Sequence, residues 1–196
     1  MSAWAHDWEL MVRVQSGEED CLGPLLARHR EPLILFLRRM VGNTAIAEEI
    51  AQEAFLRVYL HRNTYKPTAR FSTWLYHIGS NLALNWLRDH RRELDQMRLD
   101  APGDRRAPLQ IPDLSERADD AVLRGDAQAR LRAAVLDAVG ELPERQRVAL
   151  LLRRYEDMDY EQIAQVMDCS VPTIKSLLFR AHDNLRRRLT PVLPQL

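Results

Sequence analysis

The sequence predicts an all-α fold of two small helical domains, an N-terminal helical bundle and a C-terminal helix-turn-helix domain, joined by a flexible linker. Apolar residues recur at helical spacing through most of residues 7–92 and again from Asp126 onward. No stretch alternates apolar and polar residues as a β-strand would. Prolines, glycine and mixed charges interrupt the pattern over residues 94–125. We therefore expect domains at residues 1–93 and 126–196, with 94–125 as the linker.

Helix-breaking residues divide the N-terminal domain into four helices. These helices are expected over residues 7–16, 19–41, 45–61 and 72–92. Gly17 ends the first helix and Gly42 follows the second, which contains Pro32 and should be kinked there. Ser72 is the expected N-cap of the fourth helix.

The C-terminal domain is expected to hold two helices followed by a helix-turn-helix. The first two helices cover residues 126–139 and 143–154, since proline is favourable in a first helical turn. Residues 168–170 form the turn of the helix-turn-helix, and Ser170 caps its second helix. The apolar stripes on either side of the turn are Ile163, Ala164 and Met167, then Ile174, Leu177, Leu178, Ala181 and Leu185.

One face of the second helix of this pair turns away from the expected core. It carries Lys175, Ser176, Phe179 and Arg180. The second helix of a helix-turn-helix enters the DNA major groove, where Lys175 or Arg180 can bind guanine or phosphate and Phe179 can contact a thymine methyl group. A solvated basic face, or a chance amphipathic hairpin, would show the same pattern.

The net charge limits how this face can be used. The chain carries 28 basic and 28 acidic residues, a formal net charge of zero. Residues 156–168 contain five acids and no base, whereas residues 171–190 contain five bases and one acid. Because duplex affinity grows with each cation placed on a phosphate, we expect weak DNA binding by the chain alone and a larger partner that holds the DNA.

The composition is that of an ordinary soluble protein, with 46% hydrophobic and 29% charged residues. No apolar run approaches a membrane span and the N-terminus lacks the features of a signal peptide, so we expect a cytoplasmic protein without membrane insertion. The two cysteines, Cys21 and Cys169, are expected to be small buried residues. The six histidines share no metal-ligand spacing and no nucleophile–base pair is visible, so no metal, cofactor or catalytic residue is predicted.

Three stretches carry a resemblance to a known family. They are residues 48–59 (EEIAQEAFLRVY), residues 71–92 (FSTWLYHIGSNLALNWLRDHRR) and residues 142–185, which include the helix-turn-helix. Together they resemble a bacterial extracytoplasmic-function (ECF) RNA polymerase sigma factor. The resemblance implies a promoter-recognition subunit without enzyme activity of its own. It also implies an N-terminal domain that binds the polymerase clamp and opens the −10 element, and a C-terminal domain that docks on the flap and reads the −35 duplex.

The outward side of the third expected helix is acidic. A solvated face is the plain explanation, but the resemblance implies a docking surface for the basic helices of the clamp. Charge complementarity of this kind sets mainly the association rate and the orientation. The residues concerned are Glu48, Glu49, Gln52 and Glu53.

The resemblance also assigns residues to single-stranded −10 DNA. Because the chain has no glycine loop for ATP, melting must be driven by binding energy, such as base stacking in a pocket. Tyr65 offers a stacking face, Asn81 an amide for a base edge, and Ile78 an apolar wall. Together with Arg57, these residues match the family positions that line the pocket for the flipped −10 base. Phosphate contacts are expected from Arg57, Lys66, Arg88, Arg91 and Arg92. Trp74, Leu75 and Trp86 are expected to belong to the core instead.

For the −35 duplex, the corresponding set is Pro172, Thr173, Lys175, Ser176, Phe179 and Arg180. Several positions depart from the usual family pattern. Ala47 stands where an aspartate is common, His77 and His182 replace common arginines, and Asp157 and Pro172 replace glycines. Because Pro172 and His182 adjoin the reading face, the family's detailed −35 preference is not expected to carry over to this chain.

The expected linker has a geometric role. Residues 94–125 can extend about 100 Å, with a coil average of roughly 30 Å, and two promoter elements two helical turns apart lie about 70 Å from one another. Such a tether spans the gap without fixing the angle between the domains. The same slack would let the domains close around an inhibitor, so an anti-sigma factor is an expected partner.

Two other functions remain open at this point. A conventional helix-turn-helix regulator would bind operator duplex as a dimer, without polymerase. A helical adaptor would bind only protein and would leave Lys175, Phe179 and Arg180 without a role. Transcription in vitro with core polymerase distinguishes all three.

Overall fold

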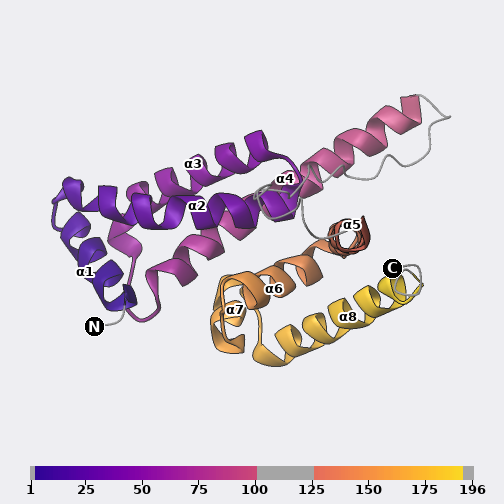
Figure 1. The fold of residues 1–196 in the computed structure, drawn as a ribbon. Helices are drawn as coiled ribbons and strands as arrows, with labels where there is room; N and C mark the ends of the chain where they lie inside the picture. Colours follow the sequence, from indigo (N-terminus) through magenta and orange to yellow (C-terminus); the bar gives the residue numbers. More distant parts are fainter. Residues whose placement is uncertain (1–2, 101–125, 192–196) are drawn as a thin grey trace.

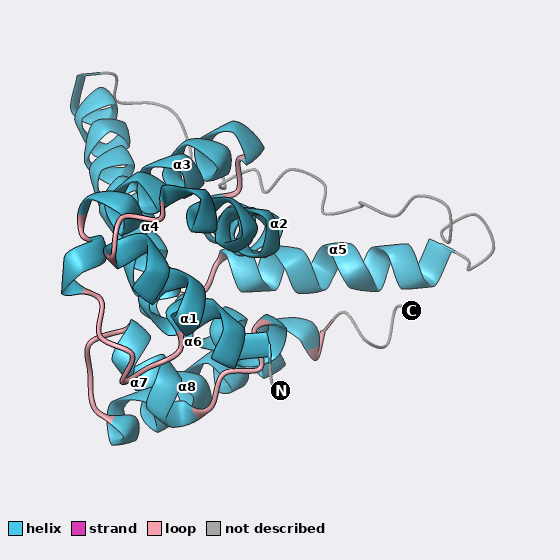
Figure 2. Ribbon diagram, turned by 90° about the vertical axis from the view of Figure 1, so that its left-hand side faces the viewer, coloured by secondary structure: helices cyan, strands magenta, loops and turns pink. Residues whose placement is uncertain are grey.

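The computed structural model describes residues 3–100 and 126–191, and every regular element within them is a helix (Figures 1 and 2). The all-α prediction is therefore confirmed. The elements are α1 (Ala3–Gln15), the 3-10 helix η1 (Glu19–Cys21), α2 (Leu22–Val41), α3 (Thr44–Leu60), the 3-10 helix η2 (Arg62–Thr64), α4 (Phe71–Asp100), α5 (Asp126–Gly140), α6 (Glu144–Tyr155), α7 (Tyr160–Val166) and α8 (Val171–Leu189).

Two expected details of α4 are wrong. The helix begins at Phe71, so Ser72 lies inside it, and it continues to Asp100, past the predicted end at Arg92. The extension has a local cause: residues 93–100 contain neither proline nor glycine, and the first helix breakers, Pro102 and Gly103, come after it. The remaining residues of the expected linker, 101–125, lie outside the described part of the chain.

The first four helices enclose a core built on α2 and α4. The ring of Phe36 meets that of Tyr76 edge to face, with centroids 5.1 Å apart, and both side chains are buried. Gly79 allows the two helices to approach, because a Cβ there would lie 3.1 Å from the Leu33 side chain. Pro32 is accommodated within a continuous α2, which Gly42 ends in the left-handed conformation with φ 73°.

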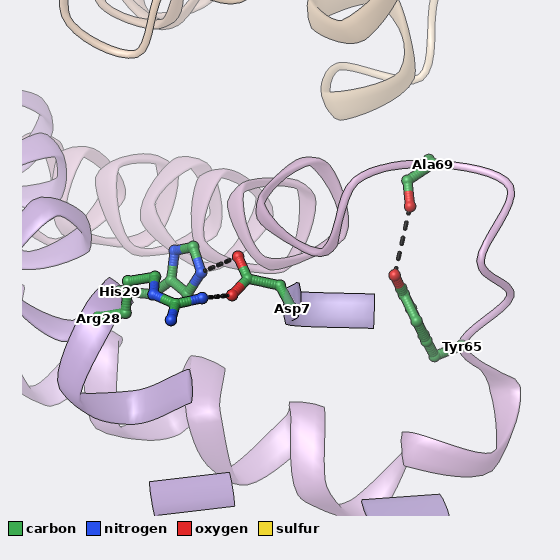
Figure 3. A network of polar contacts seen from close by, with 5 residues as sticks. All are labelled: Asp7, Arg28, His29, Tyr65 and Ala69. Carbon is green, nitrogen blue, oxygen red and sulfur yellow. Dashed lines mark hydrogen bonds and ion pairs between the residues drawn. The ribbon is translucent and has the colours of Figure 1, made fainter. Parts of the chain in front are cut away.

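A buried carboxylate fastens α1 to this core (Figure 3). Asp7 is 5% exposed; it accepts a 2.8 Å hydrogen bond from the Nε2 of His29 and pairs with the guanidinium of Arg28. Both partners come from α2. A carboxylate removed from water needs such compensation, so the contact fixes where α1 lies on the bundle.

The helix-turn-helix forms as the sequence predicts. Asp159 caps α7 in a capping box with Gln162, and Ser170 caps α8 by accepting from the Thr173 N–H. The buried stripe includes Ile163, Ala164, Met167, Ile174, Leu178 and Ala181. The connection before α7 contains Asp157 at φ 48°, in the left-handed region that favours glycine. This explains why glycine is usual there in the resembled family.

The two helical groups, α1–α4 and α5–α8, pack against each other. Helix α7 contacts α4, and α6 contacts α2. In Figure 1, α6, α7 and α8 lie below the first four helices. The buried apolar residues of both groups form one contiguous cluster, which includes Leu37 and Leu75 on one side and Leu152 and Ile163 on the other. The contact places the helix-turn-helix beside the loop that joins α3 to α4.

Candidate nucleic-acid interface

The outer face of α8 is a continuous polar and aromatic surface. Ile174, Leu178 and Ala181 point into the core, which turns the other residues outward. The six residues predicted to read duplex DNA are all exposed: Pro172, Thr173, Lys175, Ser176, Phe179 and Arg180. Phe179 is 75% exposed, an unusual position for an aromatic ring with no partner to cover it.

The cationic side chains of α8 differ in the groups of the protein that they contact. Arg187 pairs with Asp183 at 2.7 Å, and Arg188 pairs with Glu141. Lys175 lies 5.8 Å from the centre of the Tyr160 ring. Arg180 forms no ion pair with any residue the structure describes. Arg180 is therefore the cation on this face that is most available to phosphate or guanine.

The exposed side of α3 carries the predicted acidic set. Glu48, Glu49 and Gln52 are exposed, and Glu53 is half-buried. Glu53 accepts a 2.7 Å hydrogen bond from Arg57, so a residue predicted to bind polymerase is paired with one predicted to bind DNA.

The sequence reasoning missed two apolar residues on this side of α3. Leu56 and Leu60 are 50% and 60% exposed. At 100° per residue they fall opposite the buried stripe that contains Ile50, Ala54 and Val58. A helical wheel of the sequence would have shown them. Exposed apolar side chains rimmed by polar residues are typical of a protein-binding surface.

Helix α4 carries a polar face over residues 81–92. Asn81, Arg88 and Arg92 are exposed and share that face by helical spacing, whereas Ile78 is half-buried. Asn85, which the sequence reasoning missed, is exposed one turn after Asn81. The guanidinium groups of Arg88 and Arg92 both lie 3.6 Å from Asp89. The remaining predicted cation, Arg91, pairs with Glu144 of α6 at 2.9 Å.

A cavity of about 320 Å³ lies where the α3–α4 loop meets α4. Its lining consists of Thr64, Tyr65, Lys66, Thr68, Ala69, Thr73, Trp74, His77 and Gln165. Of the predicted −10 residues, the cavity brings together Tyr65 and Lys66. Asn81 reaches it indirectly, because its side-chain nitrogen lies 3.2 Å from the Nε2 of His77. Arg57 and Ile78 do not line it.

Tyr65 forms a wall of this cavity and has no open stacking face in this conformation. It is 5% exposed, with its ring centre 5.2 Å from that of Trp74 and 6.2 Å from that of Phe71. Its hydroxyl donates to the Ala69 carbonyl at 3.3 Å (Figure 3). Burial raises the pKa of Tyr65 to about 12, so the phenol stays neutral. Trp74, expected to be core, is half-buried and lines the cavity.

Other kinds of site find no support in the part of the chain that the structure describes. No group of three or more His, Cys, Asp or Glu side chains there is placed to hold a metal ion. None of the helices, over the same residues, is long and apolar enough to cross a membrane. Cys21 is buried and Cys169 half-buried, and both are free thiols.

The sequence matches two family models that correspond to the two helical groups. Residues 25–93 match the family described as Sigma-70 region 2, and residues 132–185 match Sigma-70, region 4. The chain is 33% identical over 193 residues to the RNA polymerase sigma-H factor of Pseudomonas aeruginosa, covering 95% of both chains. It is 30% identical over 191 residues to the ECF RNA polymerase sigma-E factor of Haemophilus influenzae, covering 95% of this chain and 97% of the relative.

Two solved structures share the fold. CnrH, in complex with the cytosolic domain of CnrY, aligns with a TM-score of 0.67 and 21% identity over 95% of this chain and 98% of its own. The sigma factor RpoE of Bartonella quintana, in complex with the anti-sigma factor NepR, aligns with a TM-score of 0.62 and 20% identity over 86% of this chain and 96% of its own. These alignments cover both helical groups of the fold.

Proposed function

Because the chain belongs to the ECF family of RNA polymerase sigma factors, we propose that each exposed face described above serves one step of promoter recognition. Residues 1–93 form the domain for the polymerase clamp and the −10 element, 94–125 the linker, and 126–196 the domain for the −35 element. The matches to regions 2 and 4 lie within these two domains, which supports the division.

The outer face of α8 reads the −35 duplex. Arg180 and Lys175 supply cations, Ser176 and Thr173 supply hydroxyl groups, and Phe179 supplies an apolar surface for a thymine methyl group or a sugar. The exposure of Phe179 supports this role most directly. Its ring is 75% exposed, so packing in the core does not explain an aromatic residue at this position.

The cavity beside the α3–α4 loop receives an unstacked base of the −10 strand. Trp74 offers an aromatic surface, Tyr65 supports that ring from the wall of the cavity, Lys66 holds phosphate, and Asn81 reads a base edge. Ile78 supplies an apolar wall beside Asn81, and backbone contacts follow from Arg57, Arg88, Arg91 and Arg92. Binding of the displaced strand supplies the free energy that stabilises the melted state.

The acidic side of α3 docks on the polymerase clamp. Glu48, Glu49, Gln52 and Glu53 provide complementary charge, which sets orientation and association rate. Leu56 and Leu60 provide the apolar surface that is removed from water in the complex. The C-terminal domain docks separately on the flap.

The remaining partners follow from the family. RpoE, which shares the fold, is described in complex with an anti-sigma factor, and we propose that this chain is also sequestered by one. The chain acts in the cytoplasm, where its polymerase works, and contributes binding and positioning with no catalytic chemistry of its own.

Reconstituted transcription tests the proposal. Core polymerase purified from the host bacterium is incubated with genomic promoter fragments, with and without the chain. Specific initiation that depends on the chain is the expected result. Retardation of duplex fragments by the chain alone, with no effect on core polymerase, would support a conventional helix-turn-helix regulator instead.

A further inference from the structure

The side chain of Gln15, the last residue of α1, reaches the loop that joins α3 to α4. Its Nε2 lies 2.7 Å from the carbonyl oxygen of Arg62 and 2.9 Å from that of Tyr65. A carbonyl oxygen only accepts and an amide nitrogen carries two hydrogens, so this one group donates to both carbonyls. Arg62 begins η2 and Tyr65 is its C-cap, so the two hydrogen bonds tie the whole turn to α1.

Helix α1 is a firm support for this contact. The side chains of Met11 and Val14 are fully buried, and Asp7 is held by its two partners on α2. Gly17, at φ 100°, adopts the left-handed conformation that commonly follows a helix, so α1 ends beside the loop. Gln15 is therefore fixed at its backbone, and its amide is directed at the loop from a rigid element.

The turn that Gln15 ties down forms one wall of the cavity proposed for the −10 base. Thr64, Tyr65 and Lys66 line the cavity, whereas Gln15 itself does not. We propose that Gln15 is a positioning residue for −10 recognition, which holds this wall in place before the displaced strand binds. The inference rests on the proposed function, because it assigns a further residue to the same cavity.

The support comes from outside the stretch that matches Sigma-70 region 2, which begins at residue 25. A second contact from the same segment reaches the α3 side of the loop, where the Tyr59 hydroxyl donates a 2.5 Å hydrogen bond to Glu19 of η1. Arg62 in turn donates to the Tyr59 carbonyl at 2.9 Å. The segment from Gln15 to Glu19 thus braces the loop where it leaves α3.

A positioning role differs from a purely structural one in what it changes. If only a fraction of the chains holds the cavity wall in place, the apparent dissociation constant for the strand rises by the inverse of that fraction. Docking on core polymerase uses the exposed side of α3 and should not change. A general loss of folding would instead weaken both interactions alike.

Gln15→Met and Gln15→Glu test this role, because each keeps about the same side-chain length and removes both donors. Ser16→Ala is the matched control, since the Ser16 hydroxyl donates to the Arg13 carbonyl and not to the loop. Holoenzyme is assembled from core polymerase and each full-length variant. It is titrated with a fluorescent non-template-strand oligonucleotide that covers the −10 element of a promoter identified by reconstituted transcription. The same oligonucleotide is then used with an abasic site at each −10 position in turn. Core affinity and circular dichroism are measured alongside.

Both Gln15 variants should bind the intact strand about 5- to 30-fold more weakly than wild type, the range for loss of one to two hydrogen bonds. Gln15→Glu should be the weaker, because its carboxylate faces two carbonyl oxygens. Wild type should lose most affinity at the one abasic position whose base enters the cavity. The Gln15 variants should lose less there, since the base and Gln15 act through the same wall. Ser16→Ala, and the core affinity of every form, should stay within about 2-fold of wild type.

A wild-type profile of abasic losses in both Gln15 variants would overturn the positioning role and leave the sigma function intact. Equal losses of affinity for core and for the strand would overturn it as well. If wild-type holoenzyme binds the strand no better than core polymerase alone, the proposed function of the cavity is wrong, and the positioning role is overturned with it.

Discussion

The hydroxyl of Tyr76 donates a 2.5 Å hydrogen bond to the carboxylate of Glu156, joining α4 to the residue that follows α6. Tyr76 is 2% exposed and its ring packs on Phe36, so the donor is fixed by the N-terminal core. Burial raises the pKa of Tyr76, which keeps the phenol protonated as a donor. A polar contact of the interdomain surface is thus anchored on the core of one domain.

The Glu156 carboxyl makes this interface sensitive to pH. It faces Tyr76 of α4, Arg39 of α2 and its neighbour Asp157. Burial is the largest effect and raises the pKa of Glu156 above its ordinary value of 4.5, although the Tyr76 hydrogen bond and Arg39 oppose the shift. A raised pKa means that Glu156 binds its proton more tightly when the two helical groups are packed together than when they are apart. Protonated Glu156 therefore stabilises the packing of the two helical groups. This stabilisation is complete below pH 4.5 and is lost as the pH rises through the raised pKa of Glu156.

We therefore predict that the chain is more compact in mildly acidic than in neutral solution. The radius of gyration from small-angle X-ray scattering should fall as the pH is lowered from 7.5 to 4.5 in the wild type, and Glu156→Gln should remove this dependence. Glu161→Gln, on the exposed side of α7, serves as the control and should retain it. A pH response identical in wild type and Glu156→Gln would contradict the assignment to Glu156.

Replacing Arg180 by alanine should weaken binding of the −35 element with little effect on folding, since the side chain is exposed. If Arg180 binds phosphate, the salt slope of holoenzyme binding should fall by about 1; if it binds guanine, discrimination at one base pair should fall by about 1–3 kcal/mol. Arg187→Ala, whose partner is Asp183, is the matched control with a smaller expected effect. Equal losses for the two variants would argue against a reading role for Arg180.

Leu56→Ala should weaken binding to core polymerase while changing the free energy of unfolding by no more than about 0.5 kcal/mol, because the side chain is half exposed. Ile50→Ala, on the buried side of the same helix, should cost about 2–5 kcal/mol of stability. Urea unfolding and a core-binding titration separate the two effects. If Leu56→Ala binds core with wild-type affinity, the proposal that Leu56 belongs to the docking surface is wrong.

Helical periodicity made the all-α fold and the α8 face predictable. Ile174, Leu178 and Ala181 had to be buried together, so Lys175 and Phe179 had to face outward. The capping role of Ser170 was equally predictable, because its partner, the Thr173 N–H, is only three residues away in the sequence. Features of this kind need only neighbouring residues.

Features that depend on contacts between different segments of the chain could not be predicted from the sequence. The burial of Tyr65 needs the rings of Phe71 and Trp74, brought together by the loop. The contact between His77 and Val166 joins residues far apart in the chain, whose approach no local pattern encodes. Sequence reasoning thus predicted the exposed polar face of α4 and two residues of the cavity, Tyr65 and Lys66, but not the rest of the lining or its wall from α7.

Permanganate footprinting of thymines around the −10 element tests the central claim most directly, namely that this chain enables core polymerase to open a promoter. On double-stranded templates, core plus wild-type chain should produce reactive thymines and core alone should not. Asn81→Ala, at an exposed position, should reduce that reactivity on duplex templates and have a smaller effect on transcription from pre-opened ones. Equal thymine reactivity with and without the chain would contradict the account.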